Sequence, residues 1–267
     1  DAPAPWVAVD PRRLDAQLAA VRQAAARAPV ATTMLARLLR TGDGLDSETA
    51  FELESLAYST LLGGAEFAAW HAQHQSQRQP GGGAPPPAAV RYERTDDRVV
   101  LTLASPESRN ALTAAMRDAL FEALANVVED PTRPSLLLQA DGRCFSTGGH
   151  LPEFGTARDL ARAHLIRTSR NPARVLLRIG ERAAVRVHGA CIGSGVEIGA
   201  AAARRTGAAG CFFALPELGM GLIPGAGGTV TIARAIGRHR LMWLALGGFR
   251  LGAARAVSWG LLDAVVP

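Results

Sequence analysis

The chain has 267 residues, of which 48% are hydrophobic and 20% are charged, a composition typical of a globular protein with one large domain or one domain and an appendage. The net charge is +5, and every basic side chain is an arginine. No block of five residues is purely basic, aromatic residues make up only 5%, and no zinc or RNA-binding signature occurs. These features argue against nucleic-acid binding. No apolar run reaches the roughly 18 residues of a membrane span, so we expect no membrane partner.

The three cysteines, Cys144, Cys191 and Cys211, have no metal-type spacing, and their odd number argues against a disulfide framework. The first residues lack a charged segment followed by an apolar one, which predicts no secretory signal. We therefore expect a cytoplasmic protein with reduced thiols. The absence of an initiator methionine suggests that the start of the chain has been trimmed or is missing.

Residues 1–79 are predicted to form a helical region. Apolar residues recur at helical spacing after Pro11, which can begin a helix. We expect helices from Pro11 to Pro29, at 32–39, from an Asp46 or Ser47 cap to the Gly63-Gly64 break, and at 66–79. Residues 80–89 are a glycine stretch followed by prolines, which is typical of a linker. A domain boundary is therefore predicted between the helical region and residues 90–267.

Strand and helix signals alternate from residue 90 onward. The predicted elements are a hairpin at 90–94 and 98–103, an amphipathic helix at 113–129, strands at 135–140, 183–187 and 211–215, and a tightly packed helix beginning at 193. This alternation predicts βαβ units and an α/β fold.

Two glycine-rich runs follow predicted strands, and glutamates lie in the second of them and just before a further glycine-rich stretch. The first run contains Gly148 and Gly149 and is followed by His150. The second run, Gly193-Ser194-Gly195-Val-Glu197, opens a predicted helix. Glu217 follows a third strand and precedes a further glycine-rich stretch at 219–228. Glycines let the backbone turn sharply and approach a ligand, and the first amides of a helix lack intrahelical acceptors. Two carboxylates beside such amides suit acid–base chemistry on an enolate whose oxygen is stabilised by main-chain donors.

These segments resemble the enoyl-CoA hydratase/isomerase (crotonase) family. The family pattern is matched by Phe145-Ser-Thr-Gly-Gly149-His150, by Gly193-Ser194-Gly195-Val-Glu197, and by Pro216-Glu217 followed by Gly221-Leu-Ile-Pro-Gly-Ala-Gly-Gly-Thr229. The segment Asn110-Ala111-Leu112 matches another family motif, and Glu197 and Glu217 have the twenty-residue spacing of the hydratase glutamates. The resemblance covers about residues 90–267.

The resemblance implies a fold, a set of roles and a partner. The fold would be the ClpP/crotonase type, a stacked ββα core, here behind an N-terminal helical appendage. The family roles make Glu197 and Glu217 catalytic and make the amides of Gly149 and Ser194 the oxyanion hole. They place the substrate beside Asn110, Ala111, Gly148, His150, Gly193 and Gly195. The implied activity is a lyase that adds water to a 2-enoyl-CoA in fatty-acid metabolism, with no metal, no cofactor beyond the coenzyme A of the substrate, and a homotrimeric or hexameric assembly.

The chain departs from the family pattern at three places. His150 replaces an aspartate and is expected to be neutral and to donate a structural hydrogen bond. Ser194 replaces a glycine, so its side chain should point away from the thioester. The sequence stops at Pro267, and the helices that close the acyl-CoA site in the family are expected to be absent.

Other activities stay open at this point. The helical region resembles the extension of cofactor-independent dihydroxyphenylacetyl-CoA dioxygenases, although those enzymes have a non-acidic residue at the position of Glu197. An enoyl-CoA isomerase usually needs one carboxylate, so the pair favours hydration. A catalytically idle protein of this fold that assembles through its helical region is the remaining alternative.

Overall fold

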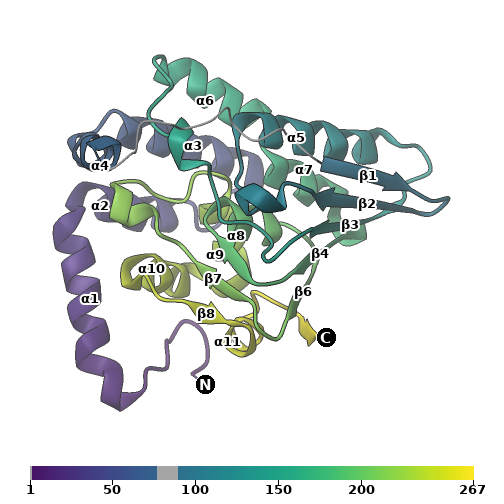
Figure 1. Cartoon of the computed structure of the whole chain (residues 1–267). Coiled ribbons are helices and arrows are strands. Elements are labelled where there is room, and N and C mark those ends of the chain that lie inside the picture. The colour runs from purple at the N-terminus through teal and green to yellow at the C-terminus, as the bar shows by residue number, and fades with distance from the viewer. Residues whose placement is uncertain (1, 77–89) are drawn as a thin grey trace.

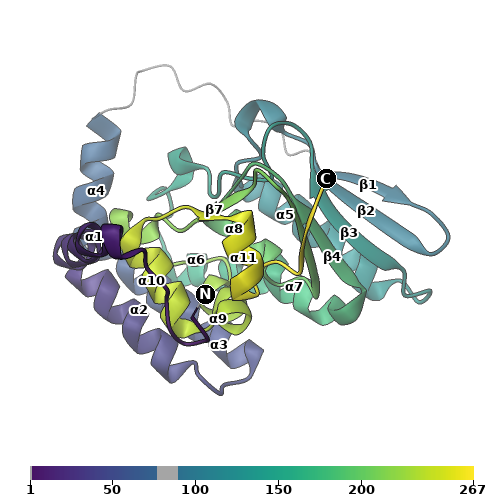
Figure 2. The same ribbon diagram turned by 90° about the horizontal axis from the view of Figure 1, so that it is seen from below.

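A computed structural model describes residues 2–76 and 90–267. In this part of the chain there are two β-sheets, with the N-terminal helices on one side of the molecule and the larger sheet on the other (Figures 1 and 2). The predicted linker at 80–89 lies outside the described residues.

The larger sheet has six strands in the order β1-β2-β3-β4-β6-β9. Their bounds are β1 Val90–Arg94, β2 Arg98–Leu103, β3 Ser135–Ala140, β4 Ala183–Val187, β6 Arg204–Ala208 and β9 Ala264–Val266. β1 and β2 form an antiparallel hairpin, and the remaining neighbours pair in parallel. The expected strands at 90–94, 98–103, 135–140 and 183–187 are confirmed with these bounds.

The smaller sheet consists of β5 Ala190–Ile192, β7 Phe212–Ala214 and β8 Leu251–Gly252. β5 follows β4 after a sharp corner at Gly189, which has φ +55°, and a Cβ there would lie 2.2 Å from the carbonyl oxygen of Arg143. A side chain at residue 189 would therefore collide with backbone. The strand expected at 211–215 is confirmed but is shorter, because it turns after Ala214 towards the site.

Helices of the core cover the sheets and present apolar faces to them. They are α5 Ala114–Glu129, α6 Leu160–Ser169, α7 Pro172–Ile179, α8 Ser194–Gly199, α9 Gly228–Ile236, α10 Arg238–Gly247 and α11 Ala253–Trp259. Short 3-10 helices lie at Pro106–Ser108, Leu151–Glu153, Gly180–Arg182 and Glu217–Met220. In α5 the predicted apolar side, from Met116 to Val127, is buried. Thr113 caps this helix rather than joining it, since its hydroxyl accepts from the Met116 amide at 3.0 Å.

The N-terminal region forms α1 Leu14–Arg27, α2 Pro29–Thr41, α3 Ser47–Leu62 and α4 Ala65–Ser76, after a 3-10 turn at Pro11–Arg13. The helix expected at 32–39 is longer at both ends, because Pro29 occupies a first-turn position where no amide donor is needed. Asp46 is the cap of α3 and accepts from the Thr49 amide at 3.0 Å.

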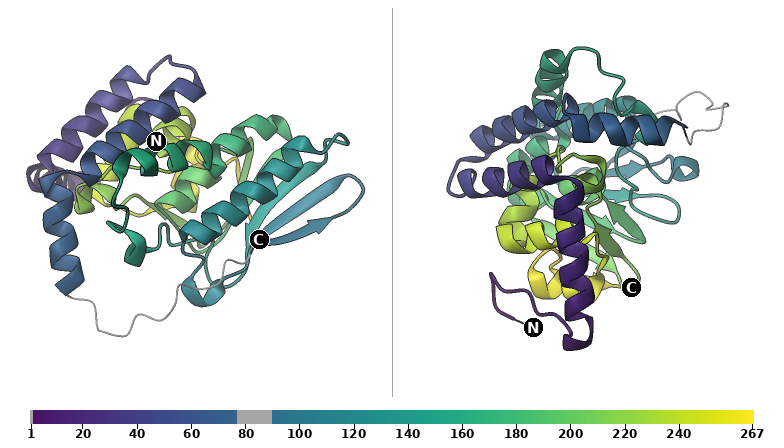
Figure 3. Two further views of the ribbon diagram at one scale, coloured as in Figure 1. Left: turned by 90° about the horizontal axis from the view of Figure 1, so that it is seen from above. Right: turned by 90° about the vertical axis from the view of Figure 1, so that its left-hand side faces the viewer.

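The N-terminal helices are packed into the rest of the molecule. α1 and α2 contact α10, and α3 contacts α6, α7 and α9 (Figure 3). Buried side chains of this region, such as Leu35, Phe51 and Phe67, belong to the same hydrophobic cluster as the sheets. The ring of Phe51 lies 2.8 Å from where Gly227 would carry a Cβ. The predicted N-terminal helical appendage therefore shares one hydrophobic core with the α/β part.

Candidate active site

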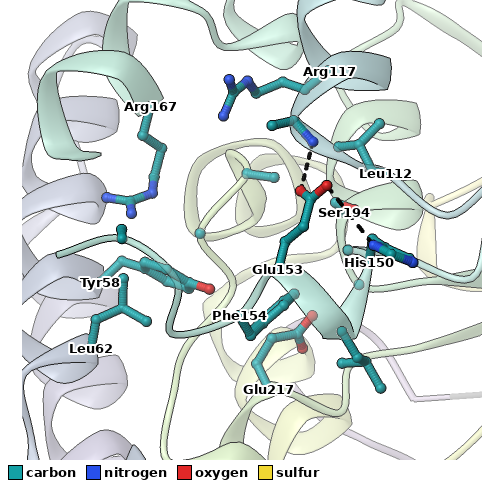
Figure 4. A pocket seen from close by; sticks show the side chains of 18 of the residues that line it. Tyr58, Leu62, Leu112, Arg117, His150, Glu153, Phe154, Arg167, Ser194 and Glu217 are labelled. Carbon is teal, nitrogen blue, oxygen red and sulfur yellow. Dashed lines mark hydrogen bonds and ion pairs between the residues drawn. The ribbon is translucent and has the colours of Figure 1, made fainter. Parts of the chain in front are cut away.

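A cavity of about 630 Å³ lies where the N-terminal helices meet the α/β core. Among the candidate residues from the sequence, Gly148, Gly149, His150, Gly193, Ser194, Glu197 and Glu217 line it. Side chains of α3 and α6 complete the wall opposite Ser194 and His150 (Figure 4). The cavity is therefore built from segments that are far apart in the sequence.

The two glycine-rich loops run side by side at the cavity. The amide of Ile192 donates to the carbonyl of Ser146 at 3.0 Å, and a Cβ on Gly148 would lie 2.8 Å from the carbonyl oxygen of Ile192. Within residues 2–76 and 90–267, the amides of Gly149 and Ser194 donate to no acceptor. Two unpaired donors from separate loops on one cavity can stabilise negative charge on an oxygen atom.

His150 and Ser194, the two residues that depart from the family pattern at this site, each have a buried polar atom without a hydrogen bond among the described residues. Nδ1 of His150 has no hydrogen bond in the described structure and lies 3.9 Å from Oε1 of Glu153. The structural hydrogen bond expected there is absent at this nitrogen, because Glu153 turns its other oxygen to the Ala114 amide at 2.7 Å. Oγ of Ser194 is also buried without a partner among the described residues.

Three residues that the family resemblance placed beside the substrate, Asn110, Ala111 and Gly195, do not line the cavity. Asn110 is fully buried, accepts from the Ser105 amide at 2.9 Å and donates to the carbonyls of Asp141 and Cys144. A Cβ on Gly195 would meet Cβ of Ser146 at 3.0 Å. Asn110 and Gly195 help to hold the loops together, and the side-chain amide of Asn110 is used for that purpose.

Glu197 extends from α8 into the cavity and is 2% exposed. Its Oε2 accepts from the amides of Ala226 at 2.7 Å and Gly228 at 2.9 Å. Burial, followed by the nearby charges of Glu217 and Glu54, raises the pKa of Glu197. The two amides fix the carboxyl group in one orientation.

Glu217 begins a 3-10 helix after β7 and is 7% exposed. One of its oxygens, Oε2, has no hydrogen-bond partner in the described part of the chain, while Oε1 lies 2.7 Å from where Gly193 would carry a Cβ. Burial raises the pKa of Glu217 from 4.5 to about 7. A carboxyl group with this pKa can exchange a proton near neutral pH.

Sequence reasoning missed a third buried glutamate, Glu54 of α3, which is 1% exposed. Its Oε1 accepts from the Gly227 amide at 2.7 Å, and its Oε2 accepts from the amide and hydroxyl of Thr229 at 2.8 and 2.6 Å. The amides of residues 226–229 thus alternate between Glu197 and Glu54. Burial raises the pKa of Glu54 to about 7. The sequence did hold a signal, since Glu54 lies one helical turn after the buried Phe51.

Tyr58 and Arg167 are further cavity residues that the sequence did not indicate. The Tyr58 ring packs on Gly225, where a Cβ would lie 2.2 Å from Cδ2 of the ring. The guanidinium carbon of Arg167 lies 4.5 Å from the centre of the same ring. Nothing near residues 58 or 167 forms a recognisable motif, so only their packing brings them to the cavity.

Within residues 2–76 and 90–267, no group of three or more His, Cys, Asp and Glu side chains could hold a metal ion. In the same part of the chain, no helix is both long and apolar enough to cross a bilayer. The three cysteines are buried and form no disulfide.

A family profile described as enoyl-CoA hydratase/isomerase matches residues 94–267. The chain belongs to the enoyl-CoA hydratase/isomerase family. A probable enoyl-CoA hydratase of Rhodobacter capsulatus is 32% identical over 179 residues, which cover 67% of this chain and 68% of that protein. The 1,2-epoxyphenylacetyl-CoA isomerase of Escherichia coli is 33% identical over 174 residues, covering 63% and 66%.

Solved structures agree with this family and with the crotonase-type fold. A putative enoyl-CoA hydratase/isomerase from Mycobacterium abscessus superposes with a TM-score of 0.62 at 28% identity, covering 67% of this chain and 70% of that one. An enoyl-CoA hydratase from Thermoplasma volcanium gives a TM-score of 0.61 at 28% identity, covering 67% and 72%. The family profile begins at residue 94, so Glu54 and Tyr58 belong to a part of this chain that it does not include.

Proposed function

We propose that the protein adds water across the double bond of a 2-enoyl-CoA through an enolate intermediate. The observation that carries the proposal is that one cavity contains both Glu197 and Glu217 together with the unpaired amides of Gly149 and Ser194. Hydration needs this set, because a carbonyl oxygen must gain negative charge while one group activates water and another supplies a proton.

The thioester oxygen of the substrate would accept hydrogen bonds from the Gly149 and Ser194 amides. These hydrogen bonds strengthen as the carbonyl oxygen gains the negative charge of an enolate, so they stabilise the transition state more than the ground state. Loss of one donor of this kind typically slows a reaction by roughly 100- to 1,000-fold. Gly149 is suited to this role because its missing side chain leaves room for the Phe154 ring, whose atoms lie 2.7 and 2.8 Å from where a Cβ would be.

The hydrogen bonds at the two glutamates indicate how the roles divide. Two amides at Oε2 stabilise the anion of Glu197, whereas Oε2 of Glu217 has no donor. From these hydrogen bonds we assign the negative charge to Glu197 and the proton to Glu217, because amide donors stabilise a carboxylate anion. Glu197 takes a proton from water as the hydroxyl adds to the β-carbon, and Glu217 gives its proton to the α-carbon of the enolate. A proton then passes from Glu197 to Glu217, directly or through water, and restores the starting state.

The coenzyme A of the substrate would be the only cofactor-like group that the reaction needs. We also propose a homo-oligomer, a trimer or hexamer, which light scattering on the purified protein would test.

An enoyl-CoA isomerase is the second candidate, because two relatives of comparable identity are named for isomerisation. One is the 1,2-epoxyphenylacetyl-CoA isomerase reported above, and the other is an enoyl-CoA isomerase/hydratase of Mycosarcoma maydis that is 31% identical over 198 residues. Isomerisation moves a proton between carbons and adds no water, so the product has the mass of the substrate.

The test is a panel of 2-enoyl-CoA and arylacetyl-CoA thioesters whose products are identified by mass spectrometry. Addition of one water supports hydration, an unchanged mass with a shifted double bond supports isomerisation, and addition of oxygen to an arylacetyl-CoA supports the dioxygenase alternative. Glu197→Gln and Glu217→Gln should each slow hydration by roughly 100-fold or more. Glu181→Gln, at an exposed glutamate away from the cavity, is the matched control. Unchanged turnover in both cavity variants would refute the proposal.

A further inference from the structure

We infer that the cavity contains a binding subsite for an anionic group at Arg167, and that the anion is a carboxylate at the far end of the acyl chain. The inference rests on the proposed function in one respect, the placement of the thioester at Gly149 and Ser194. It narrows the substrate class to CoA thioesters of dicarboxylic acids.

Arg167 is held in place by the N-terminal region. It projects from α6, and its Nη1 donates to Oγ of Ser59 at 2.8 Å, to Oγ of Ser55 at 3.1 Å and to the carbonyl of Ser55 at 3.3 Å. The face of the guanidinium lies over the ring of Tyr58, which is a favourable cation–π arrangement. One nitrogen and one face of the group are thus occupied, and the orientation of the remaining donors is fixed.

The charge of Arg167 has no carboxylate beside it, in contrast to the other arginines of the cavity. Arg117 lies 2.8 Å from Asp118, and Arg170 lies 3.2 Å from Glu122. Within the described residues, Nε and Nη2 of Arg167 donate to no acceptor and form no ion pair. Partial burial removes water from the Arg167 cation, and this desolvation lowers the pKa of Arg167. A planar fork with free donors is the geometry that binds a carboxylate most specifically.

The position of Arg167 assigns it to the acyl side of the cavity. Its partner Tyr58 packs on Gly225, and the next residue, Ala226, donates its amide to Glu197. Arg167 and Tyr58 therefore lie near the loop that holds Glu197, across the cavity from Ser194 and His150 (Figure 4). A substrate with its thioester at the two amides would extend its acyl chain past the glutamates towards Tyr58 and Arg167.

The nearby acidic groups do not satisfy this arginine. Glu54 is the closest candidate on α3, but its two oxygens accept from Gly227 and Thr229. Glu197 is held by the amides of Ala226 and Gly228. A carboxylate on the substrate would gain the hydrogen bonds that these side chains do not make.

The experiment measures binding, so that it does not depend on catalysis. Saturated acyl-CoA thioesters ending in a carboxylate, in a series of chain lengths, are titrated into the full chain by calorimetry and compared with their methyl esters. We expect at least one length at which the free acid binds about 10- to 100-fold more tightly than its ester, the range expected of a hydrogen bond to a charged group. Arg167→Met should remove this preference and leave the affinity for the ester unchanged. Arg167→Lys should retain part of the preference, because it keeps the charge and loses the fork.

Arg170→Met is the matched control, since Arg170 also borders the cavity but already has acidic partners. This variant should prefer the free acid over the ester as strongly as the unmodified protein does.

If no chain length shows a preference, or if Arg167→Met weakens acid and ester equally, the inference is overturned. If Arg167→Met instead abolishes discrimination between coenzyme A and dephospho-coenzyme A, the anion is a phosphate of the cofactor portion and the inference is also overturned. Should Arg167→Met not fold, Arg167→Lys and Ser59→Ala test the same preference. A carboxylate preference without hydration would refute the proposed reaction alone, and hydration without the preference would refute the subsite alone.

Discussion

Replacing Glu217 with glutamine should change how the stability of the protein depends on pH. The folded state holds the pKa of Glu217 at about 7, against 4.5 for an ordinary glutamate. The proton is therefore bound more tightly in the folded chain than in the unfolded one. A contribution of this sign is fully present below pH 4.5 and is lost as the pH rises through about 7.

The size of the effect follows from the difference in pKa, since each unit corresponds to about 1.4 kcal/mol, which gives a total of about 3 kcal/mol. Glutamine carries no titrating proton, so the variant lacks this dependence. The free energy of unfolding of Glu217→Gln, minus that of the unmodified protein, should therefore rise by about 3 kcal/mol between pH 4 and pH 8. Any constant cost of the new amide group cancels in this comparison.

Urea unfolding followed by circular dichroism at several pH values measures the difference. Glu181→Gln, at an exposed position, should give a difference that stays flat across the range. A flat line for Glu217→Gln as well would mean that Glu217 ionises normally in the folded protein, and the argument that it is the proton donor would fail. The same variant should have lost hydration activity, so stability at high pH and catalysis would change in opposite directions.

Two further outcomes test how the N-terminal helices support the site. Glu54→Gln should lower kcat by roughly 10- to 100-fold with little change in the affinity for a saturated acyl-CoA, because it loosens residues 226–229, which position Glu197. Equal losses of kcat and ligand affinity, tracking a loss of folded protein, would show that Glu54 only stabilises the fold. Gly225→Ala should destabilise the protein by about 1–3 kcal/mol, because its Cβ would collide with the ring of Tyr58. Tyr58→Leu should suppress this loss in thermal unfolding of the double variant, and a purely additive result would contradict the packing argument.

Much of the core could be predicted from local patterns. The strand at Ser135–Ala140 is a short apolar run bounded by turn-forming residues, and its length favours a strand because helices usually need ten or more residues. The ends of helices could be predicted less closely than strands where a proline lies between two helices. Pro29 both follows α1 and starts α2, and a proline alone does not indicate which of these roles it has.

The candidate site was only partly predictable. Glu197 and Glu217 lie beside glycine-rich loops, so their motifs indicated a common cavity, and both line it. Asn110 belongs to an equally recognisable motif, yet its amide is consumed by backbone groups of two neighbouring loops. A motif records that a residue matters to the fold or to the site, but it does not separate these two reasons.

The sequence by itself determined the α/β core, the family resemblance and the two glutamates, because each depends on residues close together in the chain. Only the tertiary structure decided that Glu54 contacts residues 227 and 229, and that Tyr58 and Arg167 form one wall of the cavity. Helical periodicity tells which face of α3 is buried but not which surface it meets. That choice depends on packing between segments more than a hundred residues apart, and no local pattern encodes it.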